Sequence, residues 1–431
     1  MKRLALPVLI LALLSGCTKE EVSPRVPVVV PPELEEYAIL PLQPRDAGLQ
    51  PMTGIALWTD NEQAGTDAIQ LEYAYMLYSD VCKEKDSYDW TCVEQVLNAV
   101  ASRHHQAVLR FRYSYVGEEC AVPAYIKALP EYEETVGKSE GERTCFPDWR
   151  CDELQRFHLA FYRLFAEKYD SDPRLAFLET GFGLWAEYHI YDGPFIPGRT
   201  FPSKAFQTQF FQGMENWFKD LPWCISIDAA DETYGPFQSE PELLDGRFGN
   251  FDDSFLCKDH DKYNAGCWRF FGTSRYRRAP MGGEFSYETT FDQKHCLDRK
   301  GLHGHTFEKE AARYHLTFII GNDQPLYQSL TRIREAGMAT GYRFVAKQLR
   351  ALGPEVAVFV ANEGVAPVYR DAFLEVDGIR ATGNLRELMP GEGRWFRATL
   401  PQPSSAPVLS VLCNHLVAGQ QISLAISPEN T

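Results

Sequence analysis

The sequence predicts an α/β fold, a (β/α)8 TIM barrel followed by a small C-terminal β-sandwich. Between residues 48 and 340, eight short apolar runs alternate with longer segments of helical spacing, the pattern of a parallel barrel. A doubly wound sheet is the main alternative, but no glycine-rich phosphate fingerprint follows the first run. From residue 341 to 431 the chain changes to short β-rich runs separated by Gly, Pro and Asn, which favours a β-sandwich.

The barrel strands are expected from apolar runs, and the helices from apolar residues spaced three or four apart. The expected strands are 54–58, 69–77, 107–113, 175–182, 223–228, a weak one before Asp252, 279–284 and 314–320. The clearest helices are 90–102, 152–168, 204–219 and 326–336, and Asp89 is the expected N-cap of the first. The expected sandwich strands are 356–362, 368–376, 395–400 and 407–412.

The N-terminus has the pattern of an exported lipoprotein. Lys2 and Arg3 precede an apolar run at 4–14, which is too short to span a bilayer. A Leu-Ser-Gly-Cys sequence at 14–17 then resembles a lipobox, so residues 1–17 are expected to be a signal peptide with Cys17 as the lipidated residue. The alternative is an ordinary signal peptide with a chance cysteine. The proline-rich stretch 18–47 is predicted to be a tether, which places the protein in the cell envelope on a membrane, the outer membrane being favoured.

Composition excludes some classes of partner. The chain has 59 acidic and 43 basic residues, a formal net charge of −16, which argues against nucleic acid as a partner because phosphates need clustered Lys and Arg. Besides Cys17 there are ten cysteines, and an even number in an exported chain favours disulfides. Cys82 with Cys92, and Cys257 with Cys267, are the local pairs expected. No CxxC pair is present, so neither a metal nor another cofactor is expected.

Two glutamates follow predicted strands at the end where barrels carry their chemistry. Glu187 follows the fourth strand in Gly-Leu-Trp-Ala-Glu-Tyr-His, and Glu284 ends the seventh in Gly-Gly-Glu-Phe. They are 97 residues apart, about three βα units, so they are expected to face each other across the barrel mouth. Glycoside hydrolysis needs two such carboxyls, one to protonate the leaving oxygen and one to attack the anomeric carbon or activate water. The alternative for each is a solvent-facing or ion-paired loop residue.

Residues near these glutamates are candidates for binding the substrate. Aromatic side chains stack on sugar rings, and Trp185 and Tyr188 also supply an apolar neighbour that raises the pKa of an acid. Arg112 is expected either to pair with Glu284 or to hold substrate, while acids and amides after the fifth, sixth and eighth strands are expected to contact hydroxyls. The candidate binding residues are Trp58, Arg112, Trp185, Tyr188, Asp228, Asp253, Phe285, Tyr287 and Asn322.

Five motifs, in order, carry a resemblance to a known family. They are YDW at 88–90, LRFRYS at 109–114, Gly-x-Trp-x-Glu at 183–187, GGE at 282–284 and GYRF at 341–344. Together they resemble the bacterial family called domain of unknown function 4832, over about residues 50–425. That family resembles the large clan of retaining glycosidase barrels, which implies an acid/base role for Glu187 and a nucleophile role for Glu284. The clan usually has Asn before its acid/base, whereas this chain has Ala186.

The sequence therefore predicts an exported lipoprotein that acts on an oligosaccharide or polysaccharide, with retaining glycoside hydrolysis as the preferred activity. The alternative from another class is a non-catalytic glycan-binding barrel of the cell envelope. A structural envelope protein without a ligand is the third.

Overall fold

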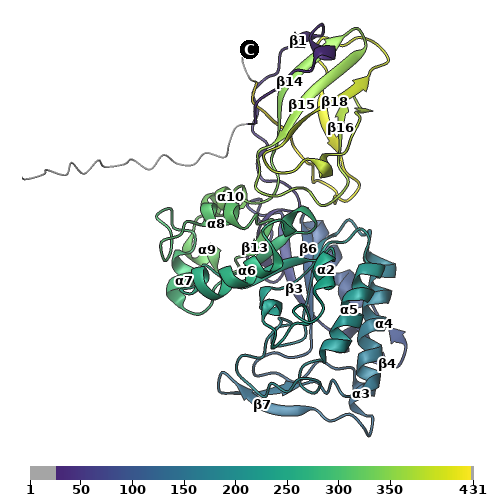
Figure 1. Cartoon of the computed structure of the whole chain (residues 1–431), viewed down its shortest axis with the longest axis vertical. Helices are drawn as coiled ribbons and strands as arrows, with labels where there is room; N and C mark the ends of the chain where they lie inside the picture. Colours follow the sequence, from purple (N-terminus) through teal and green to yellow (C-terminus); the bar gives the residue numbers. More distant parts are fainter. Residues whose placement is uncertain (1–25, 429–431) are drawn as a thin grey trace, which may run out of the picture.

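A computed structural model describes residues 26–428, so the predicted signal peptide and its Cys17 lie outside the described residues. Two lobes stack end to end, a β-rich lobe above and an α/β barrel below (Figure 1). A two-stranded hairpin, β7 (Thr135–Ser139) with β8 (Glu142–Phe146), lies at the end of the barrel farthest from the β-rich lobe (Figure 1). No helix in the described part of the chain is long and apolar enough to cross a membrane.

The lower lobe is a closed barrel of eight parallel strands, which confirms the predicted fold class. Closure is made by the eighth strand on the first, with Phe318 opposite Gly54. The first strand matches its predicted bounds. The eighth is shorter than predicted because residues 314 and 315 form the turn after the helix that ends at Arg313, and Leu316 makes only an isolated bridge with Met281. The strands are β2 (Gly54–Trp58), β3 (Leu71–Leu77), β6 (Gln106–Arg112), β9 (Leu175–Thr180), β10 (Trp223–Ser226), β11 (Gly249–Phe255), β12 (Met281–Phe285) and β13 (Phe318–Ile320).

Helices cover the outside of the barrel because each buries one apolar stripe against the strands. In α4, Phe157, Phe161 and Phe165 recur at helical spacing and are fully buried. The predicted helix 326–336 is two helices, because Gln328 is extended and the Ser329 side chain accepts a hydrogen bond from Arg332 to start the second. The main helices are α2 (Thr91–Ser102), α4 (Asp152–Tyr169), α5 (Lys204–Trp217), α6 (Ala265–Phe271), α7 (Thr290–His295), α8 (Phe307–Arg313), α9 (Gln324–Tyr327) and α10 (Leu330–Gly337).

The upper lobe consists of two packed sheets, in the place predicted for a β-sandwich. One sheet has the order β1-β14-β15-β18, with β20 also on β14, and the other has the order β17-β16-β19. Val358 and Phe396 of the first sheet and Leu374 and Val411 of the second belong to one buried cluster. The strands are β14 (Phe344–Leu352), β15 (Glu355–Asn362), β16 (Phe373–Val376), β17 (Ile379–Arg380), β18 (Gly393–Thr399), β19 (Leu409–Leu412) and β20 (Ala425–Ile426).

The described part of the predicted tether 18–47 is not a free linker. Strand β1 (Ala38–Leu40) pairs antiparallel with β14. Val26 packs against Phe359, and Arg350 donates a hydrogen bond to the Leu34 carbonyl at 2.9 Å. Residues 26–47 therefore belong to the upper lobe, because the apolar side chains between the prolines pack against its larger sheet.

The expected disulfides do not form in this structure. All ten cysteines within residues 26–428 are free, including Cys82 with Cys92 and Cys257 with Cys267. Most of them are buried and behave as small apolar residues. Cys224, for example, is fully buried in the barrel wall and contacts the Pro280 carbonyl.

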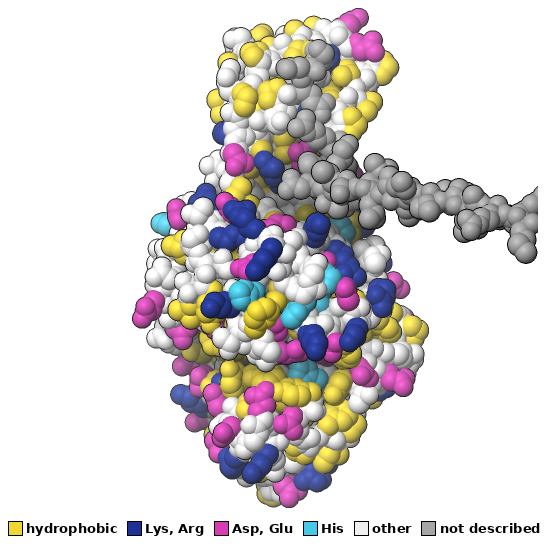
Figure 2. Space-filling model, turned by 90° about the vertical axis from the view of Figure 1, so that its left-hand side faces the viewer, with side chains coloured by type: hydrophobic (Ala, Val, Ile, Leu, Met, Phe, Trp, Pro, Cys, Tyr) yellow, Lys and Arg dark blue, Asp and Glu magenta, His cyan; other side chains and the backbone are white. Residues whose placement is uncertain are grey.

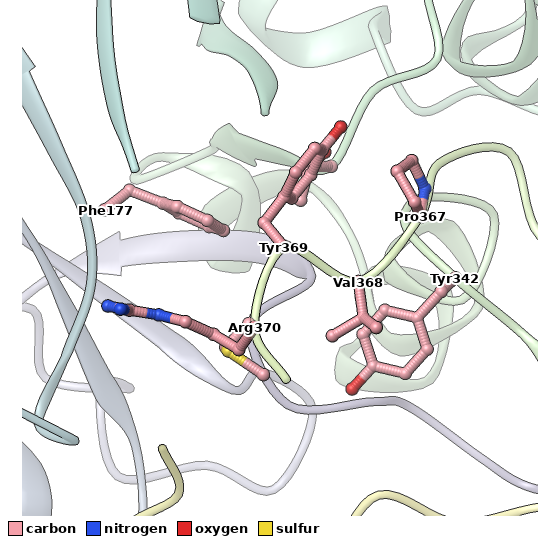
Figure 3. A pocket seen from close by; sticks show the side chains of 8 residues that line it. Phe177, Tyr342, Pro367, Val368, Tyr369 and Arg370 are labelled. Carbon is pink, nitrogen blue, oxygen red and sulfur yellow. The ribbon is translucent and has the colours of Figure 1, made fainter. Parts of the chain in front are cut away.

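The upper lobe closes the barrel end at which the strands begin. Phe177 and Phe318 stack inside the barrel with ring centroids 4.8 Å apart, and they share a buried cluster with the sandwich core. Tyr369 and Arg370 reach from the upper lobe toward Phe177 (Figure 3), and Arg370 donates to the Leu175 carbonyl at 3.2 Å. The cavity left here is about 10 Å³, room for no more than one water. This end of the barrel therefore has no space for a substrate.

Gly341 makes the passage from barrel to sandwich possible. Its φ is +66°, and a Cβ on it would lie 2.2 Å from Thr53 Cγ2. Gly353, in the turn between β14 and β15, has a similar φ of +60° but open space around its Cβ position.

We predict that Gly341→Ala lowers the free energy of unfolding by about 2–4 kcal/mol, from left-handed strain plus overpacking. Gly353→Ala is the matched control and should cost only the strain, about 1–2 kcal/mol. Urea denaturation of both variants measures the difference. Equal losses of unfolding free energy in the two variants would show that contact with Thr53 does not restrict the residue at position 341.

Candidate active site

A layer of polar side chains points into the barrel near the ends of its strands. Successive residues of a strand point to opposite faces, so residues two apart share the interior. In β9, Phe177 packs inside the barrel and Glu179 follows it two residues later; in β11, Phe251 and Asp253 have the same relation. The interior therefore changes from apolar to polar within each strand.

Arg110 of β6 lies at the centre of this layer and is fully buried. Its Nε donates to Glu179 Oε2 at 2.8 Å, and its Nη1 donates to Asp253 Oδ2 at 2.5 Å. The guanidinium also lies 4.1 Å from the ring centroid of Phe251. A buried cation held by two carboxylates fixes the ends of β6, β9 and β11 relative to one another.

Glu187 reaches the same region from a compact loop after β9. Backbone amides of Phe182 and Gly183 both donate to the Glu187 carbonyl, at 3.2 and 2.8 Å. A Cβ on Gly183 would lie 1.9 Å from the His189 carbonyl oxygen, and Trp185 and Ala186 have positive φ. The loop thus turns back on itself, which leaves the Glu187 side chain 11% exposed.

Glu284, in β12, also lies in this polar layer. Its Oε1 is buried without a hydrogen-bond partner among residues 26–428. Gly283 before it allows close strand contact, because a Cβ there would lie 2.2 Å from the Asp252 carbonyl oxygen.

The two glutamates share one electrostatic environment, as their predicted joint site requires. Burial raises the pKa of each carboxyl well above its usual value, and the charge of Asp253 raises each further. Arg110 opposes both shifts, and the charge of Glu284 itself raises the pKa of Glu187. Raised carboxyl pKa values with named charge partners are typical of sites that move protons.

His189 links Glu187 to a further acid. Its Nδ1 is 2.8 Å from Asp228 Oδ2 and 3.4 Å from Glu187 Oε2. His189, Ser226 and the Tyr263 hydroxyl lower the pKa of Asp228, although its burial acts in the opposite direction. Asp228 is therefore a carboxylate that orients His189 beside Glu187.

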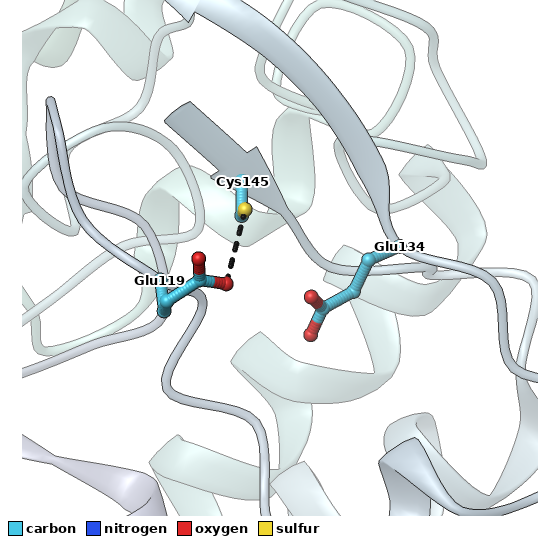
Figure 4. A group of neighbouring side chains, drawn as sticks. All are labelled: Glu119, Glu134 and Cys145. Atoms are coloured by element: carbon cyan, nitrogen blue, oxygen red, sulfur yellow. Dashed lines mark hydrogen bonds between the residues drawn. The ribbon is translucent and has the colours of Figure 1, made fainter. Parts of the chain in front are cut away.

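Two groups in the described residues have a spacing that suits a metal ion. One is Glu187, His189 and Asp228; the other is Glu119, Glu134 and Cys145 (Figure 4). In the second group, Arg143 pairs with Glu119 at 2.5 Å and Lys127 pairs with Glu134 at 2.8 Å. These two cations already neutralise the two carboxylates, so the group has no excess negative charge to attract a metal ion.

Aromatic side chains surround the carboxylates. Tyr191, Tyr263 and Tyr287 are 56%, 46% and 49% exposed, unlike most large apolar residues of the barrel. Burial raises the pKa of both phenols, and the charge of Asp228 beside Tyr263 and of Asp323 beside Tyr287 raises it further. Trp185 stacks on Tyr191 with ring centroids 5.9 Å apart. Exposed rings held next to acids are suited to contacts with sugar faces and hydroxyls.

Other predicted binding residues have structural partners. Asn322 Oδ1 accepts hydrogen bonds from the Trp58 amide at 3.1 Å and from Asn61 at 2.8 Å, which ties the eighth strand to the first. Arg112 pairs with Glu118 at 2.7 Å rather than with Glu284, and its Nε and Nη1 are buried without partners among the described residues. Trp58 and Arg112 still lie at the strand ends, with Tyr75 between them.

Two predicted sugar contacts are wrong. Phe285 is fully buried and packs on Phe307, because the residue after an inward Glu284 must point outward to the helices. Tyr188 is fully buried against Phe182 and Phe201. Asp252, beside Asp253, points outward for the same reason and accepts hydrogen bonds from Asn264 and Trp268.

The sequence reasoning missed five residues of the site. Arg110 lies two residues before Arg112 in β6, and Glu179 lies two residues after Phe177 in β9. Residues two apart in a strand point to the same face, so this spacing could have indicated that both side chains point into the barrel. His189, Tyr191 and Tyr263 lie in long loops, where no periodic pattern marks an inward side chain. The missed residues are Arg110, Glu179, His189, Tyr191 and Tyr263.

Known proteins resemble this chain in fold alone. No protein-family model matches it, and no curated protein sequence matches it. Among solved structures, a GH5_18 protein from Streptomyces cattleya in complex with GlcNAc is 12% identical with a TM-score of 0.35, over 62% of this chain and 66% of that one. The catalytic domain of a beta-amylase from Paenibacillus polymyxa is 10% identical with a TM-score of 0.40, over 67% and 98%. A glycoside hydrolase family 30 subfamily 8 xylanase from Clostridium acetobutylicum is 10% identical with a TM-score of 0.38, over 85% and 97%. Similarity this low assigns no activity.

Glu187 should make stability fall with rising pH. Its pKa in the folded protein is raised above the ordinary 4.5, so folding binds a proton that the unfolded chain releases. That stabilisation is complete below pH 4.5 and is lost as pH rises through the folded pKa. Glu187→Gln removes this titration. Above pH 4.5, the free energy of unfolding of the variant should therefore rise relative to that of the wild type by up to about 1.4 kcal/mol per pH unit.

Urea unfolding of both proteins from pH 4.5 to 7.5 measures this gain. Glu232→Gln, at an exposed position, is the control and should differ from wild type by a constant amount. A constant difference for Glu187→Gln as well would show that burial does not hold a proton on this side chain.

Proposed function

We propose that this protein is a retaining glycoside hydrolase, with Glu187 as acid/base and Glu284 as nucleophile. The observation that carries the proposal is that two glutamates from opposite sides of the barrel lie near the same two charges. Asp253 raises the pKa of both carboxyls and Arg110 lowers it. Both lie at the strand ends opposite the sandwich, the end at which barrel enzymes carry their chemistry.

The reaction then takes two steps. In the first, a Glu284 oxygen attacks the anomeric carbon, the bond to the leaving oxygen breaks, and Glu187 gives its proton to that oxygen. In the second, Glu187 takes a proton from water as the water oxygen attacks the anomeric carbon and releases Glu284. The free enzyme must therefore hold one proton on Glu187 and none on Glu284.

The two glutamates differ in the further acids beside them, Asp228 for Glu187 and Asp323 for Glu284. Glu187 lies next to Asp228, whose charge raises the pKa of Glu187. Burial raises the pKa of Glu284 as well, and Arg110 opposes the rise on both glutamates, so the proposal requires the pair to release its first proton from Glu284. His189, between Glu187 and Asp228, is placed to hold the Glu187 carboxyl in one orientation.

The exposed rings support carbohydrate as the substrate. Tyr287 lies near Glu284, and Tyr191 lies near Glu187, each close enough for the carboxyl charge to raise the pKa of the phenol. A sugar that reaches both glutamates therefore passes between these rings. On the face in Figure 2, acidic and basic side chains are interspersed, so binding by a broad patch of one charge is not suggested there.

A glycan-binding protein without turnover is the second candidate, and Ala186 favours it. Retaining barrels of this kind usually have an Asn before the acid/base, as the resemblance to that clan implies. Here Ala186 is buried and has a positive φ, so no amide is present to hold the sugar next to the reacting carbon.

We also propose that the chain is exported and lipid-anchored through Cys17, in the cell envelope. The supporting observation is the order of charged residues, apolar run and cysteine at the N-terminus. Val26, the first residue that the structure describes, packs on the upper lobe, so an anchor nine residues earlier at Cys17 is expected to place the sandwich nearer the membrane than the carboxylates.

Glutamine substitution tests the catalytic roles. Glu187→Gln and Glu284→Gln should each reduce kcat on a turned-over aryl glycoside by about 10²–10⁴-fold, since each removes a group that acts only in the transition state. Glu232→Gln should leave kcat unchanged. Proton NMR of the first product should show retained anomeric configuration.

Unchanged turnover in either glutamate variant, with the fold intact by circular dichroism, would end the catalytic assignment. Binding of a glycan that survives both substitutions, with no product formed by wild type, would establish the glycan-binding alternative.

A further inference from the structure

Asp253 lies between the two proposed catalytic glutamates with half of its carboxylate unused. Its Oδ2 accepts the hydrogen bond from Arg110 at 2.5 Å. Its Oδ1 is buried, and no donor within residues 26–428 reaches it. The Asp253 side chain is only 6% exposed. Its charge is the largest effect of any neighbouring residue on the pKa of Glu187 and of Glu284.

Other acceptors in this layer are unused as well. Glu179 Oε1 is fully buried without a donor among the described residues, and so is Glu284 Oε1. Buried oxygens of this kind are costly unless a hydrogen bond reaches them. Three such atoms in one place indicate a ligand that brings hydrogen-bond donors.

The charges in the layer also indicate a cation. Glu179, Asp253, Glu187 and Glu284 surround a single guanidinium, that of Arg110. Arg112 adds no net charge, because it pairs with Glu118 at 2.7 Å. His189 lies between Glu187 and Asp228, so any charge it carries is shared with a further acid. With Glu187 protonated, as the proposed mechanism requires, the carboxylates of Glu179, Asp253 and Glu284 outnumber the single guanidinium, so the layer is negative when these three are ionised.

We infer that the proposed active site takes glycosides of amino sugars with a free amino group, and that Asp253 receives the ammonium group. This inference rests on the proposed function, since it places the amino-bearing ring against Glu284. An ammonium brings three N–H donors and one positive charge, whereas a hydroxyl brings one donor and no charge. An N-acetyl group brings one N–H donor and no charge, so it satisfies fewer of the unused acceptors than an ammonium does.

A bare divalent cation suits the same place less well. Calcium takes six to eight oxygens and magnesium demands octahedral geometry, while the Arg110 guanidinium occupies one oxygen of both Glu179 and Asp253. A sugar carboxylate would meet the acids directly, so uronic acids are excluded from this position.

Wild-type protein tests the inference without any variant. Nitrophenyl glycosides of glucosamine and galactosamine are compared with their 2-hydroxy and N-acetyl counterparts. We expect kcat/KM for an amino form to exceed both counterparts by about 10–100-fold, the effect of one charged hydrogen bond. The preference should shrink when the pH is raised until the sugar amine is neutral. Equal or lower kcat/KM for the amino forms overturns the inference while hydrolysis itself stands.

Equilibrium binding separates this inference from the proposed function. Calorimetry with glucosamine, glucose and N-acetylglucosamine should show binding of the amino sugar at least tenfold tighter than the other two. If no glycoside is hydrolysed, the proposed function fails. The inference about the amino group is then tested by the binding measurement alone, and equal binding of the three sugars overturns it. Asp253→Asn, with circular dichroism to verify its fold, should bring the binding ratio close to one. A ratio that stays above tenfold in Asp253→Asn shows that another group recognises the amine.

Discussion

The buried guanidinium of Arg110 is the constraint on which the arrangement of the site depends. Removing a cation from water costs several kcal/mol, and this cost is recovered only with well-placed carboxylates. Glu179 supplies one from β9, which precedes Glu187, and Asp253 supplies the other from β11, which pairs with the strand of Glu284. The same ion cluster sets the charge that Glu187 and Glu284 feel, so the structural and electrostatic roles of Arg110 cannot be separated.

Such a cluster can exist because the rest of the barrel interior is apolar and closed. Between the polar layer and the upper lobe, Phe177 and Phe318 stack, and the sandwich core continues from them without a gap larger than one water. Water therefore reaches the acids from one end only. Burial raises carboxyl pKa values when water is excluded, so the sandwich acts on the site indirectly by sealing the opposite end.

The fold could be predicted because its signals are periodic. Apolar runs gave the barrel strands to within a few residues, with the eighth the main exception, and the change in composition near 341 gave the start of the sandwich lobe. The tether was mispredicted because prolines hid the short β1, whose partner β14 lies more than 300 residues later in the chain. The even number of cysteines indicated disulfides, but in this structure the cysteines of the described residues are free thiols, and most of them are buried as single apolar side chains.

The site was predictable only in part, for a geometric reason. Glu187 and Glu284 were found because glycines and aromatics mark their strand ends. Phe285 and Tyr188 were misassigned, Phe285 because a shift of one residue along a strand reverses the face. The rim residues Tyr191 and Tyr263 come from loops whose path no local pattern specifies.

Trapping the covalent intermediate tests most directly whether the two glutamates act as one catalytic pair. Glu187→Gln is incubated with a dinitrophenyl glycoside of the sugar that the wild type prefers, whose leaving group needs no acid. The second step then lacks its base, so a glycosyl adduct should accumulate and peptide mass spectrometry should place it on Glu284. An adduct on another residue, or hydrolysis without any adduct and with inverted configuration, would contradict the account.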